Sequence, residues 1–221
     1  MAALFAPRTG QALLLRSVDT GDADKAVTLL SPEHGQFAAI ARHARASKRR
    51  FGPALQPFCL FEAAWRPKPG GLAFLESAHA LEFPLGADPG LEALGSAYLF
   101  LELALELCPL AEPQPAFFEL VLGGLRRLGK GSESAPAVRL SVLWGALALA
   151  GLAPDLETGR AIGSLNLDPL DREALLRASE GHPIPTARPR AERALLDQLA
   201  LHLGRPLRTA GLADQLTGET P

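Results

Sequence analysis

Residues 11–82 alternate between short apolar runs and clusters of turn-forming residues. Five of the runs have the length and composition of β-strands, and they cover residues 12–18, 26–30, 36–41, 58–65 and 72–81. The segments between them are rich in Gly, Pro and Asp, which favour turns. Five strands with a long excursion between the third and the fourth predict an OB-fold, a small barrel whose open face binds single strands and oligonucleotides.

A helical spacing of apolar residues replaces this pattern after residue 90. The first predicted helix places six residues on one face, Leu91, Leu94, Tyr98, Leu101, Leu105 and Cys108, and places Glu92, Glu102 and Glu106 on other faces. Further helices are predicted over 115–128, 137–150, 190–203 and 207–216, and one more begins at Pro169 after an Asp168 N-cap. The chain is therefore predicted to be an α+β multidomain protein, with a barrel domain at 1–84 and an all-helical domain at 85–221.

Charge is distributed unevenly between these two parts. Residues 1–84 carry a net charge of +3, whereas residues 85–221 carry −5. Residues 41–58, ARHARASKRRFGPALQPF, contain five Lys or Arg within nine positions, and we call this segment the basic tract. Such a local excess of cations favours a surface that binds phosphate, although a solvated charged loop is the alternative interpretation.

The predicted DNA contacts of the basic tract are its cations, which would neutralise phosphates, together with one aromatic ring. Phe51 lies between Arg50 and Gly52, so we expect it to be exposed and able to stack on a base, whereas Phe58 begins an apolar strand and is assigned to the core. Neighbouring strands offer secondary contacts. The predicted DNA-binding residues are Arg42, Arg45, Lys48, Arg49, Arg50, Phe51, Arg16 and Lys25.

Catalytic motifs receive little support from the sequence. The segment from Gly124 to Lys130 matches seven positions of a phosphate-binding P-loop, but Gly131 replaces the required Ser or Thr and a helix is predicted where that motif needs a strand. We interpret this segment as a helix end with a cationic last turn. The five histidines show no metal-binding spacing, and no GxSxG elbow is present. We therefore expect neither an enzyme nor a cofactor.

Several short motifs, in their order and spacing, resemble the RecO family of recombination mediators across most of the chain. They are ALLLR at 12–16 with Asp24, VTLL at 27–30 with EHG at 33–35, ARHAR at 41–45 with SK at 47–48, ALQPF at 54–58, AY at 97–98 with EL at 102–103, and GLAPDL at 151–156. The resemblance implies an N-terminal OB-fold and a helical C-terminal domain that bind single- and double-stranded DNA and anneal complementary strands. It also implies action with RecR to help RecA replace single-strand-binding protein.

The sequence departs from a common version of the family pattern, in which two CxxC pairs after the Pro-Asp-Leu motif hold zinc. Residues 159–163, GRAIG, stand where the first pair would fall, and 164–190 contain no cysteine and only one histidine, His182. Because Cys59 and Cys108 are the two cysteines of the chain, a Cys-type zinc site cannot form in this region. We expect no metal, and some family members do without zinc.

The helical half offers four cations near apolar helices, Arg126, Arg127, Lys130 and Arg139. A cleft that combined them would suit the acidic, apolar C-terminal tail of a single-strand-binding protein, although ordinary solvation of helix ends is the alternative. Residues 1–10 lack the pattern of a signal peptide, and the most apolar later window, 140–153, is too short to span a bilayer. We therefore expect a cytoplasmic protein with no membrane partner. A scaffold that does not bind DNA remains the second functional hypothesis.

Overall fold

A computed structural model of the chain describes residues 6–156 and 167–212. The chain forms two compact units. The barrel unit comprises Met1–Pro84 and Cys108–Leu122, and the helical unit comprises Leu85–Leu107 and Gly123–Pro221. The long helix α2 (Pro115–Lys130) therefore contributes its first half to one unit and its second half to the other.

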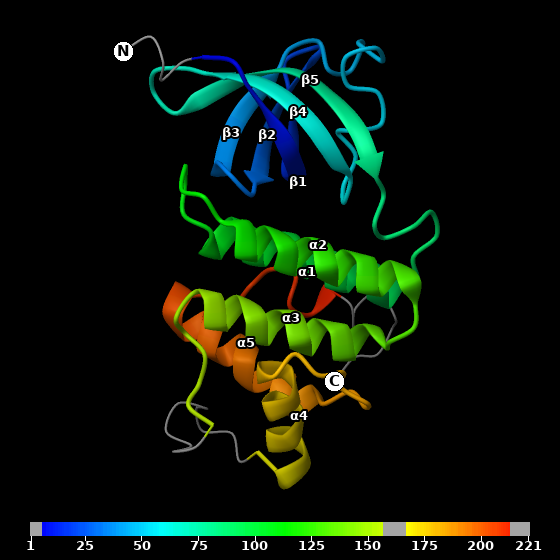
Figure 1. Cartoon of the computed structure of the whole chain (residues 1–221), viewed down its shortest axis with the longest axis vertical. Helices are drawn as coiled ribbons and strands as arrows, with labels where there is room; N and C mark the ends of the chain where they lie inside the picture. Colours follow the sequence, from blue (N-terminus) through cyan, green and yellow to red (C-terminus); the bar gives the residue numbers. More distant parts are fainter. Residues whose placement is uncertain (1–5, 157–166, 213–221) are drawn as a thin grey trace. The chain divides into compact units, whose positions relative to one another are not determined.

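Five strands close into a barrel in the order β1-β2-β3-β5-β4, which confirms the predicted OB-fold architecture (Figure 1). The strands are β1 (Arg8–Thr20), β2 (Asp24–Ser31), β3 (Gly35–Ala41), β4 (Leu60–Pro67) and β5 (Leu72–Glu82). Closure depends on β1, because Leu13 pairs with Leu30 of β2 on one side and with Leu60 of β4 on the other. A register shift between Leu14 and Arg16 lets this long strand bend between its two neighbours. All neighbouring strands are antiparallel except β3 and β5, which are parallel.

The barrel core is built from alternate residues of all five strands. Trp65 of β4 is 2% exposed, and its ring stacks on Phe37 with 4.8 Å between centroids. Part of the basic tract belongs to this core, because Phe51, Ala54 and Leu55 are buried in the same cluster. The long excursion between β3 and β4 therefore folds back onto the barrel.

The segment before α2 packs on the barrel through backbone contacts. Ala111 N–H donates to the Gln36 carbonyl at 2.9 Å, and Gln114 N–H donates to the Pro32 carbonyl at 3.1 Å. Gly35 has a positive φ of 65°, and a Cβ at this position would lie 1.8 Å from the carbonyl oxygen of Glu112. Only glycine satisfies both the backbone conformation and the close approach at this position.

In the helical unit α3 lies at the centre and contacts α1, α4 and α5 (Figure 1). The helices are α1 (Leu91–Leu107), α3 (Ala135–Leu149), α4 (Pro169–Ser179) and α5 (Pro189–Leu203). The predicted Asp168 cap is confirmed as a capping box: Asp171 N–H donates to the Asp168 carboxylate at 2.8 Å, and Asp171 accepts from Asp168 N–H. Gly124 to Lys130 are helical and Gly131 ends α2 with a φ of 63°, which confirms the helix-end interpretation.

Two sequence expectations about the helices are wrong in detail. The predicted apolar face of α1 includes Leu91 and Tyr98, which are 52% and 37% exposed, whereas Glu102 is 5% exposed. A helix that is apolar on nearly all sides gives its periodicity little power to choose the buried face. The helix predicted over 207–216 does not begin at 207, because residues 208–211 form turns; residue 212 is helical, and residues 213–216 lie outside the described residues.

Candidate nucleic-acid interface

The basic tract is held to the barrel by a defined set of backbone contacts. It consists of consecutive turns, beginning with His43 at a positive φ of 54°. The His43 N–H donates to the Asp24 carboxylate at 2.8 Å, and Arg45 N–H donates to the Ala23 carbonyl at 3.1 Å. Further along, Ala78 N–H of β5 donates to the Arg50 carbonyl at 2.8 Å. These contacts fix both ends of the charged portion of the loop.

Arg50 stabilises the loop from within. Its Nη2 donates to the Arg42 carbonyl at 2.7 Å, its Nε donates to Ser47 Oγ at 3.1 Å, and its guanidinium lies 5.0 Å from the centroid of the Phe51 ring. Arg50, predicted as a DNA contact, is therefore bonded within its own loop and is not a freely solvated cation. It is half-buried because the loop wraps around its side chain.

Phe51 is 2% exposed, so the predicted exposure of this ring is wrong. The ring lies in the barrel core with Ala54 and Leu55, and it has no accessible face on which a base could stack. Phe58, assigned to the core, is buried as expected, with 8% of its surface exposed.

Two of the predicted cations are already paired with a carboxylate. Lys25 donates to Asp19 at 2.8 Å, and Arg45 Nε lies 3.9 Å from the same carboxylate and also donates to the Asp22 carbonyl at 3.2 Å. The hydrogen bond from Lys25, with its charge and that of Arg45, holds the pKa of Asp19 below its ordinary value despite a small opposing effect of burial. This carboxylate partly neutralises both cations.

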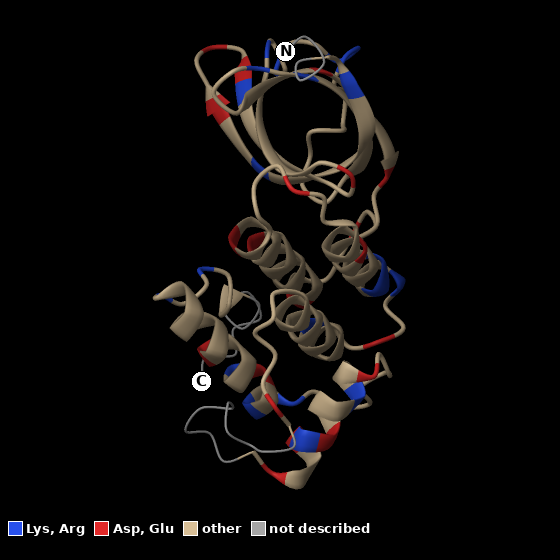
Figure 2. Cartoon of the chain, turned by 60° about the vertical axis from the view of Figure 1, so that its left-hand side comes forward, with Lys and Arg blue, Asp and Glu red and all other residues tan. Residues whose placement is uncertain are grey.

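The remaining predicted cations of the barrel are exposed: Arg16, Arg42, Lys48 and Arg49. Among the described residues none of the four forms an ion pair with a carboxylate. In Figure 2 the Lys and Arg positions of the barrel are blue on a mostly tan ribbon, with a few acidic positions in red. Each of these four unneutralised cations is exposed on the barrel unit and can attract phosphate.

Arg42 differs from the other three because it rests on an aromatic ring. Its guanidinium lies 4.4 Å from the centroid of Phe74, a half-buried residue of β5, and the ammonium group of Lys68 lies 3.6 Å from the same centroid. Sequence reasoning assigned no role to Lys68 or Phe74. The strand pattern placed Phe74 in β5, but only the fold brings it beside Arg42.

The four cations predicted for partner binding are not all available. Arg139 is 6% exposed, and its guanidinium donates to both carboxylate oxygens of Glu192 at 2.6 and 3.0 Å, so its expected role on an open cleft is wrong. Arg127 forms a two-point pair with Glu133 at 2.8 and 2.6 Å, which holds the pKa of Glu133 below its ordinary value. Arg126 is half-buried, and Lys130 is exposed at the end of α2.

A pocket of about 560 Å³ in the helical unit contains Arg139 but none of the other three cations in its lining. Its charged residues include Glu92, Glu192 and Asp197 as well as Arg193. An acidic peptide would meet these carboxylates, so the pocket does not provide the predicted cationic cleft.

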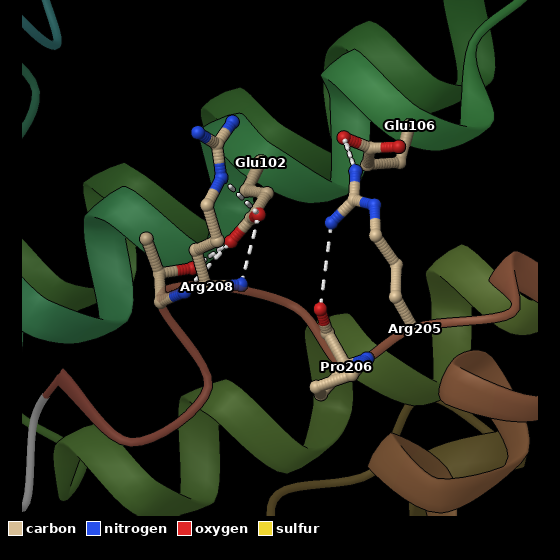
Figure 3. Close-up of polar contacts among 6 residues, drawn as sticks. Glu102, Glu106, Arg205, Pro206 and Arg208 are labelled. Atoms are coloured by element: carbon tan, nitrogen blue, oxygen red, sulfur yellow. Dashed lines mark hydrogen bonds and ion pairs between the residues drawn. The ribbon is translucent and has the colours of Figure 1, made fainter.

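The chain after α5 is attached to α1 by two glutamates (Figure 3). Glu102 accepts hydrogen bonds from Arg208 N–H at 3.0 Å, from Thr209 N–H at 2.8 Å and from the Thr209 hydroxyl at 2.5 Å. One turn later, Glu106 pairs with Arg205 at 2.6 Å. Burial acts to raise the pKa of Glu102, but these hydrogen bonds and the charge of Arg208 together hold it below its ordinary value.

Across the described ranges, 6–156 and 167–212, no group of three or more His, Cys, Asp or Glu could hold a metal ion. The segment 159–163, where the family pattern places the first cysteine pair, lies outside the described residues. No described helix combines the length and the apolar character needed to cross a membrane.

Comparisons with known proteins assign both parts of the chain. Residues 7–83 match the family model "Recombination protein O N terminal", and residues 89–211 match "Recombination protein O C terminal". The DNA repair protein RecO of Anaeromyxobacter sp. (strain K) is 41% identical over 154 residues, covering 69% of this chain and 60% of that protein. The protein of the same name from Pelobacter propionicus is 35% identical over 183 residues, covering 80% of this chain and 73% of that protein.

The DNA repair protein RecO of Myxococcus xanthus is 38% identical over 147 residues. The match spans 60% of the length of the Anaeromyxobacter and Myxococcus relatives. Matches to both halves, in the same order as the barrel and the helices, have one explanation: the chain belongs to the RecO family of DNA repair proteins.

Proposed function

We propose that this protein binds single- and double-stranded DNA through the phosphate backbone, using the exposed cations of the barrel. The observation that carries the proposal is the set of four cations without carboxylate partners, Arg16, Arg42, Lys48 and Arg49, on a loop and strand fixed to a closed barrel. Because hydrogen bonds already hold the backbone of the loop, binding a strand costs little further backbone entropy. The loop is built of turns and inserts no helix or strand into a groove, so binding should show little sequence preference.

Membership of the RecO family supports a role in DNA repair and recombination beyond simple binding. We propose that the protein anneals complementary strands in the bacterial cytoplasm and acts with RecR to help RecA replace single-strand-binding protein on DNA. Annealing requires no bond to be made or broken in the DNA backbone, so the proposed role requires no catalytic group. Lys130, exposed at the end of α2, is the proposed contact for the acidic tail of a single-strand-binding protein.

The test is the binding of labelled single-stranded DNA at several salt concentrations, with unrelated oligonucleotides of equal length. Phosphate neutralisation predicts a linear fall of log affinity with log salt, with a slope of about −0.7 for each phosphate contact. Affinities for unrelated sequences should agree within about tenfold at fixed salt. Absence of salt-dependent binding would overturn the proposal in favour of a scaffold that acts only through proteins.

A further inference from the structure

We propose that Arg42 and Lys68, held by the ring of Phe74, form a two-cation site for one phosphate of a bound single strand. This inference rests on the proposed DNA binding and places one contact on the outer wall of the barrel. Two cations that have no acidic partner among the described residues lie over the single ring of Phe74.

The three residues come together through the strand register. Phe74 of β5 pairs with Ile40 of β3 on one side and with Arg66 of β4 on the other. Arg42 directly follows β3, and Lys68 directly follows β4. The parallel pairing of β3 with β5 and the antiparallel pairing of β4 with β5 therefore bring the ends of two strands to the same ring.

The chemistry of this contact favours a phosphate over other ligands. A cation above a ring interacts with the π face, so the hydrogen-bond donors at the rim of the group remain available. Within the described part of the chain, neither side chain has a carboxylate partner, and the Arg42 guanidinium donates no hydrogen bond to the protein. Two like charges near one ring repel each other, and an anion bound by both removes that repulsion.

A nucleic acid strand fits better than a free phosphate because the site continues into the basic tract. Arg42 begins the charged portion of the tract, and the exposed Lys48 and Arg49 follow within seven residues. A strand that placed one phosphate between Arg42 and Lys68 could place others at these cations. The half-buried Phe74 ring positions Arg42 and Lys68, which lie over it. We assign it no stacking on a base, the role expected of the buried Phe51.

Arg66 provides a matched control on the same wall of the barrel. Arg66 of β4 is the register partner of Phe74 in β5. Its guanidinium forms an ion pair with Glu76 at 3.1 Å, so its charge is already neutralised. Arg42→Gln combined with Lys68→Gln should make the slope of log affinity against log salt shallower by about 0.7 on single-stranded DNA, because the contact to one phosphate is lost. Arg66→Gln should leave the slope within error of the original protein.

Phe74→Leu tests the positioning role, because leucine keeps the apolar contact and removes the π face. The affinity of the otherwise unchanged protein should fall by about twofold to fivefold. The same change in the Arg42→Gln, Lys68→Gln background should have no further effect, because the cations that the ring holds are absent. Thermal unfolding of each variant establishes that the barrel remains folded.

The outcomes separate this inference from the broader proposal. If the original protein binds DNA with salt dependence but the double variant keeps its slope, the two-cation site is wrong while DNA binding stands. If Phe74→Leu weakens both backgrounds equally, the ring does not act through the two cations, and the inference is likewise overturned. If the original protein binds no DNA, the proposed function itself fails.

Discussion

Arg139 of α3 and Glu192 of α5 form a buried two-point ion pair, with Nε–Oε1 and Nη2–Oε2 distances of 2.6 and 3.0 Å. Arg139 Nη1 also reaches Ser96 Oγ of α1 at 3.2 Å. The pair thus joins three helices of the helical unit that are distant in the sequence. Its geometry satisfies the donors of a group that burial would otherwise make costly.

Arg139→Ala should destabilise the helical unit by about 3–5 kcal/mol, because the buried Glu192 carboxylate would lose the guanidinium of Arg139. Replacing both residues by apolar ones, Arg139→Met with Glu192→Leu, should restore most of the loss. Denaturant unfolding of the two variants measures the difference. If the single and double variants lose equal stability, the ion pair itself stabilises the unit. The loss in Arg139→Ala would then not come from burying the Glu192 carboxylate without Arg139.

Glu102→Gln should cost about 1–3 kcal/mol, because an amide cannot accept hydrogen bonds at both of its terminal atoms. The folded pKa of Glu102 lies below its ordinary value of 4.5. Its stabilising effect is therefore complete above pH 4.5 and is lost as the pH falls through the lower folded pKa. The difference in melting temperature between Glu102→Gln and the original protein should shrink in that range.

Glu106→Gln is the control on the same helix, since its pair with Arg205 is partly exposed. It should cost less than about 1 kcal/mol. A pH-independent difference for Glu102→Gln would contradict the role assigned to the carboxylate.

His34 gives the barrel unit its own pH dependence. Burial, with the charge of Arg8, lowers the pKa of His34 below 6.5 against the opposing effect of Glu33. Arg8 Nη1 lies 3.3 Å from His34 Nδ1, which accepts only while the ring is neutral, and the ring meets Trp65 edge-on at 5.1 Å. The stabilisation is complete above pH 6.5 and is lost as the pH falls through the lower folded pKa. His34→Gln should remove this component from the barrel's melting curve, whereas an unchanged pH profile would exclude it.

The sequence predicted the five strands and the helices well because both depend on local patterns. Turn residues separate the strands, and Asp168 before Pro169 identifies a helix start regardless of what surrounds it. The buried face of α1 could not be predicted in the same way, because Glu102 is buried by partners near residue 208, more than 100 positions away. The Glu102 carboxylate accepts from backbone N–H groups of a turn, which lies in a segment predicted to be helical.

The candidate site was predicted only as a charged segment. Counting cations identified Lys48 and Arg49, but it could not separate them from Arg50, which bonds within its own loop. The spacing of Phe51, Ala54 and Leu55 is a signal that could have identified the buried side of the tract. No local signal places Phe74 beside Arg42, because strand register sets that contact.

Cys59 and Cys108 should resist alkylation in the folded protein at neutral pH. Both thiols are buried, and burial raises the pKa to about 11 for Cys59 and to about 12 for Cys108, so little of the reactive thiolate is present. Mass spectrometry after iodoacetamide treatment should detect no label in the native protein and two labels after denaturation. Rapid native labelling at either position would show that the thiol is accessible.

The salt dependence of DNA binding by the Lys48→Ala, Arg49→Ala variant tests the DNA-binding role of the basic tract most directly. The control removes two cations of the barrel unit that are already paired, by Lys25→Ala with Arg66→Ala. The first variant should bind single-stranded DNA with a slope shallower by about 1.4, while the control keeps the original slope. Equal slopes for the original protein and a correctly folded Lys48→Ala, Arg49→Ala variant would contradict the assignment and place the DNA site elsewhere.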